Sequence, residues 1–130
     1  IEDVKTYFKH FKDLEKIAPV SFVRGNCDQC ERWPQKLLLN FENVSIGISH
    51  LPENLYLFKP DEIQVYIHGH THYPAIRENK DRILIINPGS ILEPRPKSTF
   101  YQFIKEESPK PSVAFLFLEN DTRSAIIRKL

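Results

Sequence analysis

Long hydrophobic runs are missing from this sequence of 130 residues, and so is an excess of either charge. The longest apolar stretches, Ile83 to Ile86 and Val113 to Leu118, are far shorter than the roughly 20 residues that a membrane-spanning helix needs. Lys and Arg number 18 against 17 Asp and Glu, which leaves a formal net charge of +1. Such a balance creates no overall field that favours nucleic acid or an anionic membrane as a partner.

Cysteine is also scarce, since Cys27 and Cys30 are the only two. They are too few and too close together for a disulfide framework, and nothing in the sequence resembles a secretory leader. We therefore expect a protein of the reducing cytoplasm. A redox pair or half of a zinc site is the weaker interpretation, because the chain has no second pair of cysteines.

The chain is predicted to form one folded domain over residues 1–130. Hydrophobic residues make up 41% of it and charged residues 27%, which is ordinary for globular proteins and unlike disordered or fibrous chains. The order of its apolar segments predicts mixed α/β sheets that pack on one another. From their helix and strand spacing, Phe8, Phe11, Phe115 and Phe117 are expected in the core. The expected elements are a helix over 3–18, strands over 20–23, 36–41, 44–49, 63–67, 75–78, 82–86, 112–118 and 124–127, helical turns within 52–59, and an exposed, proline-rich excursion over 92–111.

The segment Gly69-His70-Thr71-His72 follows a predicted strand and is the most informative part of the sequence. In extended backbone, residues two apart point to the same side, so the imidazoles of His70 and His72 are expected to converge. Imidazole suits Zn, Fe, Mn, Ni or Cu, and Gly69 is expected to let the backbone pass close to the site. A solvated histidine pair at a strand end is the alternative interpretation.

Three other predicted strand ends carry groups that fit such a site. Asn26 lies in the Gly25-Asn26-Cys27-Asp28 segment, His50 follows the strand over 44–49, and Asn87-Pro88-Gly89-Ser90 is a predicted turn whose asparagine shapes the site wall. Loops at strand ends commonly build functional sites, so these segments are expected to meet.

Four blocks of sequence, in this order, resemble the calcineurin-like metallophosphoesterase superfamily and specifically its compact bacterial and archaeal phosphodiesterase branch. The blocks are Arg24-Gly25-Asn26-Cys27-Asp28, Ser49-His50, Gly69-His70-Thr71-His72 and Asn87-Pro88-Gly89-Ser90. The resemblance implies an α/β fold, an α-β-β-α sandwich of two packed mixed sheets whose first strands lie upstream of Ile1. It also implies an enzyme that hydrolyses a phosphate ester, and relatives that self-associate suggest a homo-oligomer.

The resemblance assigns roles to particular residues. It implies that Asn26, His50 and His70 bind one divalent metal ion and that His72 binds a second, the ions being Mn, Zn, Fe or Ni. The two ions clamp the phosphate and activate a water. Around the ligands, Cys27 takes the place of a histidine proposed as a proton donor. The remaining residues expected to contact the ligands or the substrate are Asp28, His68 and Arg24, with a solvated arginine as the alternative for Arg24.

The family's D-x-H and G-D blocks are missing, because the chain contains no Asp-x-His and no Gly-Asp. We therefore expect an upstream segment to complete the binuclear centre and to supply its bridging aspartate. Two other functions stay open. One is a non-catalytic scaffold of the same fold, and the other is a protein that binds a single metal ion without catalysis.

Overall fold

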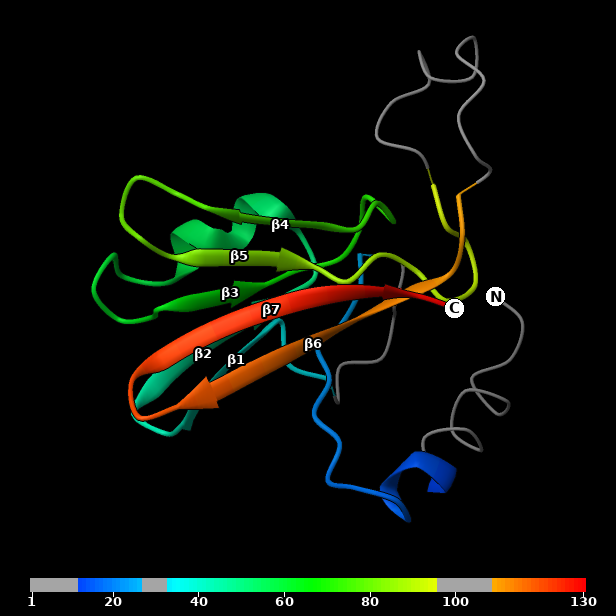
Figure 1. Ribbon diagram of the computed structural model, residues 1–130, viewed down its shortest axis with the longest axis horizontal. Coiled ribbons are helices and arrows are strands. Elements are labelled where there is room, and N and C mark those ends of the chain that lie inside the picture. Colours follow the sequence, from blue (N-terminus) through cyan, green and yellow to red (C-terminus); the bar gives the residue numbers. More distant parts are fainter. Residues whose placement is uncertain (1–11, 27–32, 96–108) are drawn as a thin grey trace, which may run out of the picture.

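The computed structural model describes residues 12–26, 33–95 and 109–130. They form a five-stranded mixed sheet of order β1-β2-β3-β5-β4 and a two-stranded sheet, β6-β7, that packs on one face of it (Figure 1). The elements are β1 (Lys36–Phe41), β2 (Val44–Ser49), the 3-10 helix η1 (Pro52–Leu57), β3 (Val65–Ile67), β4 (Ala75–Glu78), β5 (Leu84–Asn87), β6 (Ser112–Glu119) and β7 (Thr122–Lys129). No helix within these residues is long and apolar enough to span a membrane.

Two hairpins join neighbouring antiparallel strands through two-residue turns. Glu42 and Asn43 connect β1 to β2 with φ of 51° and 60°, and Asn120 and Asp121 connect β6 to β7 with φ of 43° and 72°. Positive φ at both positions gives the type I′ turn, whose twist matches that of the flanking strands. The predicted strands over 36–41 and 44–49 are confirmed residue for residue.

The centre of the large sheet is parallel. Strand β3 pairs with β2 on one side and with β5 on the other, both in parallel. The register places Ile48, Ile67 and Ile86 level with one another across the three strands. The segments that follow β2, β3 and β5 therefore leave the sheet at the same edge, where ligands bind in α/β sheets.

Alternating side chains give the sheet an apolar cluster on each face. On one face, Tyr66 and Ile85 join Phe58, close to η1. On the other face, the neighbouring residues Val65 and Ile86 pack with residues of the β6-β7 hairpin. Because successive side chains of a strand point to opposite faces, β3 and β5 contribute to both clusters.

The expected sandwich is found only in part. The described residues contain one mixed sheet, and the second sheet is an antiparallel hairpin, with little helix. Of the helix expected over 3–18, residues 12–15 are helical and 1–11 lie outside the described residues. Ile17 of its apolar stripe is 81% exposed, so the described end of this helix does not pack into the core.

Two further expectations are corrected. Residues 20–23 do not form a strand, because within the described chain no neighbouring strand pairs with them. Phe22 instead packs edge-on against Trp33, with ring centroids 5.2 Å apart. Phe115 and Phe117 were expected in the core, but they are 45% and 52% exposed. They lie on the outer face of β6, because the residues that alternate with them, Ala114, Leu116 and Leu118, pack on the sheet.

The burial of Tyr66 predicts how the free energy of unfolding changes at alkaline pH. Its hydroxyl donates to the Leu51 carbonyl, and burial raises the pKa of this fully buried phenol to about 12. Tyr66→Phe should cost about 1 kcal/mol at pH 8, because the carbonyl loses its partner. The unfolded phenol ionises near pH 10, so the free energy of unfolding of the wild type should fall relative to Tyr66→Phe by about 1.4 kcal/mol per pH unit between pH 10 and 12, which removes the wild-type advantage by about pH 11. Urea unfolding of both proteins at pH 8 and pH 11 measures this, and a constant difference would contradict it.

Candidate metal centre

Three side chains from distant parts of the sequence meet at the carboxyl edge of the parallel strands. Nε2 of His50 lies 2.8 Å from Oδ1 of Asn26. Nδ1 of His70 lies 3.3 Å from the same oxygen and 3.3 Å from Nε2 of His50. The imidazole rings of the two histidines are nearly perpendicular, with an interplanar angle of 80°. One oxygen and two nitrogens thus form a small triangle, which we call the Asn26–His50–His70 triangle.

The dimensions of this triangle fit a divalent cation. Ligands about 2.1 Å from a metal ion lie about 3.0 Å apart in octahedral geometry and about 3.4 Å apart in tetrahedral geometry. The three distances fall in or close to this range. The described residues contain no group of three His, Cys, Asp or Glu placed to hold a metal, so the amide oxygen of Asn26 is needed as the third ligand. Asn26 and His70 are exposed, which leaves room for water and substrate.

His72 faces a different neighbour. Its Nδ1 lies 2.8 Å from the carbonyl oxygen of Glu93 and 3.7 Å from the Glu93 carboxylate. A carbonyl only accepts hydrogen bonds, so Nδ1 carries the proton and, in the neutral ring, Nε2 carries the lone pair. Such a bond fixes the tautomer of a histidine ligand. In this tautomer, Nε2 of His72 carries the lone pair that a cation would require.

The other expected site residues lie elsewhere or outside the described chain. His68 stacks on Tyr66, and its Nδ1 donates to the Gly69 carbonyl. Burial lowers the pKa of His68, although that hydrogen bond acts in the opposite direction. Arg24 is half-buried and its backbone N–H donates to Pro34, with no side-chain bond to the triangle. Cys27 and Asp28 lie outside the described residues.

The backbone of the histidine segment corrects the expected route to convergence. Strand β3 ends at Ile67, and His70 and His72 have φ of 68° and 59°, in the left-handed region. The two imidazoles therefore diverge to different partners instead of sharing one face of an extended strand. Gly69 was expected to permit a close approach, but a Cβ there would lie 3.7 Å from the His50 ring, an ordinary contact.

Several residues that hold the site were not singled out for that role in the sequence. Ser49 accepts a hydrogen bond from Asn54 of η1 and donates to the Gln35 carbonyl, which fixes the chain just before His50. Asn87 donates to Gly69 and Thr71. Both residues belong to the four blocks quoted from the sequence, and the structure adds the bonds through which they hold the site. The role of the Glu93 carbonyl could not be predicted from the sequence, because every residue has a backbone carbonyl.

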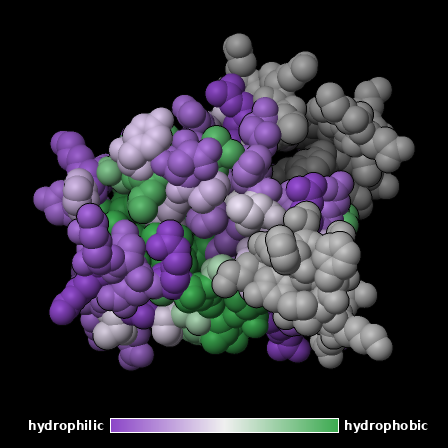
Figure 2. All heavy atoms as spheres, turned by 90° about the horizontal axis from the view of Figure 1, so that it is seen from above, coloured by the Kyte–Doolittle hydropathy of each residue, from purple (hydrophilic) through white to green (hydrophobic). Residues whose placement is uncertain are grey.

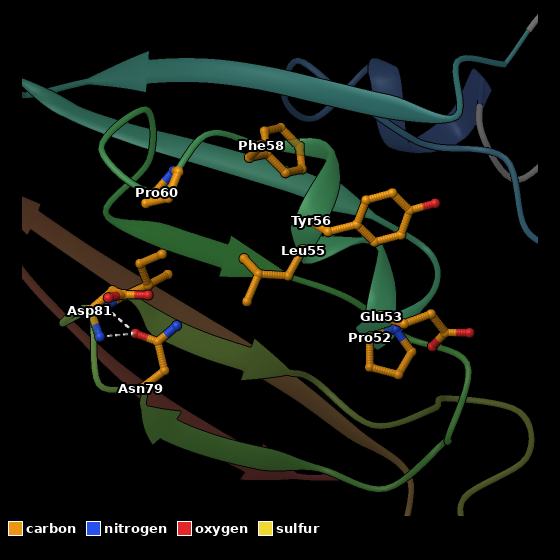
Figure 3. A pocket seen from close by; sticks show the side chains of 9 residues that line it. Pro52, Glu53, Leu55, Tyr56, Phe58, Pro60, Asn79 and Asp81 are labelled. Atoms are coloured by element: carbon orange, nitrogen blue, oxygen red, sulfur yellow. Dashed lines mark hydrogen bonds between the residues drawn. The ribbon is translucent and has the colours of Figure 1, made fainter.

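A separate groove lies between η1 and the turn that joins β4 to β5 (Figure 3). Its volume is about 410 Å³, and no histidine lines it. Glu53 of η1 and Asp81 of the turn lie toward opposite ends, with Leu55 between them (Figure 3). Seen from above, the molecule is mostly hydrophilic, with apolar side chains showing between the polar ones (Figure 2). The groove shares no residue with the Asn26–His50–His70 triangle.

The described residues form an α/β fold whose Asn26–His50–His70 triangle has the dimensions of a cation site, and the comparison with known families specifies the class of protein. The model of the calcineurin-like phosphoesterase superfamily domain matches residues 3–108. The chain belongs to this superfamily, and the resemblance carried by the four sequence blocks is confirmed.

Small archaeal and bacterial proteins are among its relatives. The probable metallophosphoesterase of Methanothermobacter thermautotrophicus is 37% identical over 93 residues, which cover 64% of this chain and 54% of the relative. Phosphodiesterase YfcE of Escherichia coli is 35% identical over 96 residues, which cover 63% of this chain and 50% of the relative. The chain thus spans about half the length of these curated relatives.

Solved structures share the fold at lower identity. Vps29 of Entamoeba histolytica, in a crystal structure complexed with Zn²⁺, superposes with a TM-score of 0.67 and 19% identity over 94% of this chain and 74% of that one. A predicted phosphoesterase of Streptococcus pneumoniae gives a TM-score of 0.58 and 19% identity over 82% and 69% of the two chains. These likenesses establish a metallophosphoesterase and Vps29-like fold.

Two glycines near the site should respond differently to alanine. Gly89 has φ of 85°, and a Cβ there would lie 2.0 Å from Oγ of buried Ser112, whereas Gly69 has room for one. Gly89→Ala should lower the free energy of unfolding by at least about 2 kcal/mol, through strain and overlap. Gly69→Ala should change it by less than about 1 kcal/mol. Urea unfolding measures both, and equal losses would contradict the structure.

Proposed function

We propose that this chain carries the metal-binding residues of a phosphoesterase, specifically a phosphodiesterase, that uses divalent cations. The observation that supports this most strongly is the Asn26–His50–His70 triangle. Its three atoms come from segments that are far apart in the sequence, and their mutual distances of 2.8, 3.3 and 3.3 Å suit one coordination sphere. The superfamily membership gives the chemical class of the reaction.

Asn26, His50 and His70 are proposed to hold one cation, and His72 to contribute to a second. Nitrogen and amide oxygen ligands suit Zn, Mn, Fe or Ni. When bound, such cations stabilise negative charge on a phosphate ester and lower the pKa of water. The chain's own residues orient the site. Ser49 fixes the approach to His50, and the Glu93 carbonyl fixes the tautomer of His72.

The exposure of the site suits an enzyme that acts on a phosphate ester. Asn26 and His70 lie at the surface, so three protein ligands leave coordination positions open to solvent and substrate. Structural metal sites, by contrast, are closed by four protein ligands. The same triangle disfavours a scaffold of this fold, because protein binding alone does not require converging lone pairs.

Metal titration separates one-ion from two-ion binding. The three ligands of the triangle should hold one Zn²⁺ ion per chain, while His72, as a single protein ligand, should not retain a second tightly. His50→Ala and Asn26→Ala should each weaken Zn²⁺ binding by at least about 10-fold. Isothermal titration calorimetry of the full chain, with Asn40→Ala on exposed β1 as the asparagine control, measures this. Unchanged affinity in both site variants would refute the proposed ligands.

Hydrolysis of bis(p-nitrophenyl) phosphate tests the proposed reaction. With Mn²⁺ or Zn²⁺ in large excess, so that the weak second position at His72 is also occupied, the full chain should release p-nitrophenol, and a chelator should stop the release. His70→Ala should reduce the rate by at least about 100-fold, beyond the loss typical of residues that only support a ligand. Asn40→Ala should leave the rate unchanged. Activity that survives His70→Ala would exclude the proposed centre, and metal binding without hydrolysis would favour the mononuclear binder.

A further inference from the structure

Asn87, the last residue of β5, connects the two loops that border the triangle. It is 1% exposed, and its side-chain amide makes three hydrogen bonds. Nδ2 donates to the Gly69 carbonyl at 3.1 Å and to Oγ1 of Thr71 at 2.7 Å, while Oδ1 accepts from the N–H of Gly89 at 3.0 Å. Two donors and one acceptor are therefore all used, although an asparagine that only shaped a turn would need the acceptor alone.

The two bonds donated by Nδ2 reach the segment in which the backbone is strained. His70 and His72 are both left-handed, and Thr71 lies between them. Left-handed residues other than glycine cost of the order of 1–3 kcal/mol each and persist only where the surroundings hold them. The N–H of Thr71 donates to the same Gly69 carbonyl at 2.8 Å, and its hydroxyl also accepts from the N–H of Tyr73. Asn87 thus donates hydrogen bonds to this turn at two points, the Gly69 carbonyl and the Thr71 hydroxyl.

The turn determines where the two histidines point. Gly69 is further tied to the site by its N–H, which donates to the His50 carbonyl at 2.9 Å. From this anchored position, His70 reaches Asn26 and His50, and His72 reaches Glu93. Loss of the Asn87 bonds would leave the Thr71 hydroxyl bonded to the Tyr73 N–H and the Gly69 carbonyl bonded to Thr71 and His68. These remaining bonds all lie within the same loop, so the strained turn would lose its connection to β5.

We infer that Asn87, acting through Thr71, is a positioning residue that holds His70 and His72 in their liganding directions before a cation arrives. The inference rests on the proposed function, since it assigns these histidines to metal binding. Ligands held in advance bind a metal more tightly than ligands that must be ordered on binding. Residues that support a ligand in this way typically change metal affinity by about 10–100-fold.

The test uses substitutions that separate the two halves of the Asn87 amide. Asn87→Asp keeps an acceptor for Gly89 but removes both donated bonds, and Thr71→Val removes the hydroxyl with little change of shape. Both should weaken Zn²⁺ binding by the full chain by about 10–100-fold in calorimetry. Thr71→Ser retains a hydroxyl and should recover most of the affinity.

A matched asparagine controls for loss of stability alone. Asn79 lies in the turn at the other end of β5, where Oδ1 accepts from the N–H groups of Asp81 and Ile83. Asn79→Ala should lower the melting temperature of the metal-free chain and leave Zn²⁺ affinity unchanged. Wild-type affinity in both Asn87→Asp and Thr71→Val would overturn the inference, and so would an equal loss of affinity in Asn79→Ala.

A metal-free measurement separates this inference from the proposed function. The rings of His50 and His70 have centroids 5.2 Å apart, so their protons should show nuclear Overhauser contacts in the folded wild-type chain. Thr71→Val should weaken these contacts, and Asn79→Ala should keep them. If the wild-type chain bound no Zn²⁺, the proposed function would fail, and the ring contacts alone would decide whether Asn87 and Thr71 position the histidines. Unaltered ring contacts in Thr71→Val would then refute the inference that Asn87 and Thr71 position the histidines.

Discussion

The parallel pairing of β2, β3 and β5 is the constraint on which the site depends. Ile48, Ile67 and Ile86 stand level in this register, so His50, the histidine segment and the Asn87 turn all leave the sheet at one edge. A shift of one residue in any strand would turn its side chains to the opposite face and displace its loop. The buried alternation of Val65 with Tyr66 and of Ile85 with Ile86 specifies the register, because both faces of the sheet are covered.

The β6-β7 hairpin reinforces this edge from the second layer. Its inner residues pack against Val44, Ile46, Val65 and Ile86. At its start, Ser112 donates through its hydroxyl to the Pro88 carbonyl and through its backbone N–H to Ser90. Its side chain fills the space beside Gly89, which has room for no side chain of its own. The turn after β5 is therefore held between Ser112 on one side and the side chain of its own Asn87 on the other.

Much of this arrangement could be predicted from local sequence patterns, and the failures have physical causes. Strands over 36–41 and 44–49 were predictable because apolar residues flank a polar Glu-Asn pair, in which Asn43 tolerates left-handed backbone. The apolar run over 20–23 predicted a strand that is absent, since a strand also needs a neighbour. Phe115 and Phe117 were misplaced because alternation shows which residues share a face of a strand, but not which face is covered. The meeting of His50 and His70 followed from the ends of β2 and β3, whereas the place of Asn26 followed from the family motif alone, because no strand precedes it in the described chain. The left-handed turns came from hydrogen bonds that no spacing encodes.

The strained turn is the local feature that the proposed metal binding would explain best. An extended segment after β3 would have avoided two left-handed residues, at a saving of the order of 1–3 kcal/mol each. The actual path sends the side chains of His70 and His72 to separate places, one toward Asn26 and the other toward Glu93. Two ions that share a phosphate need ligands that approach from different sides, and an extended segment presents its alternate side chains on one side only. The cost of the turn is therefore understandable if each histidine serves its own cation, with buried Asn87 supplying bonds that offset part of the strain.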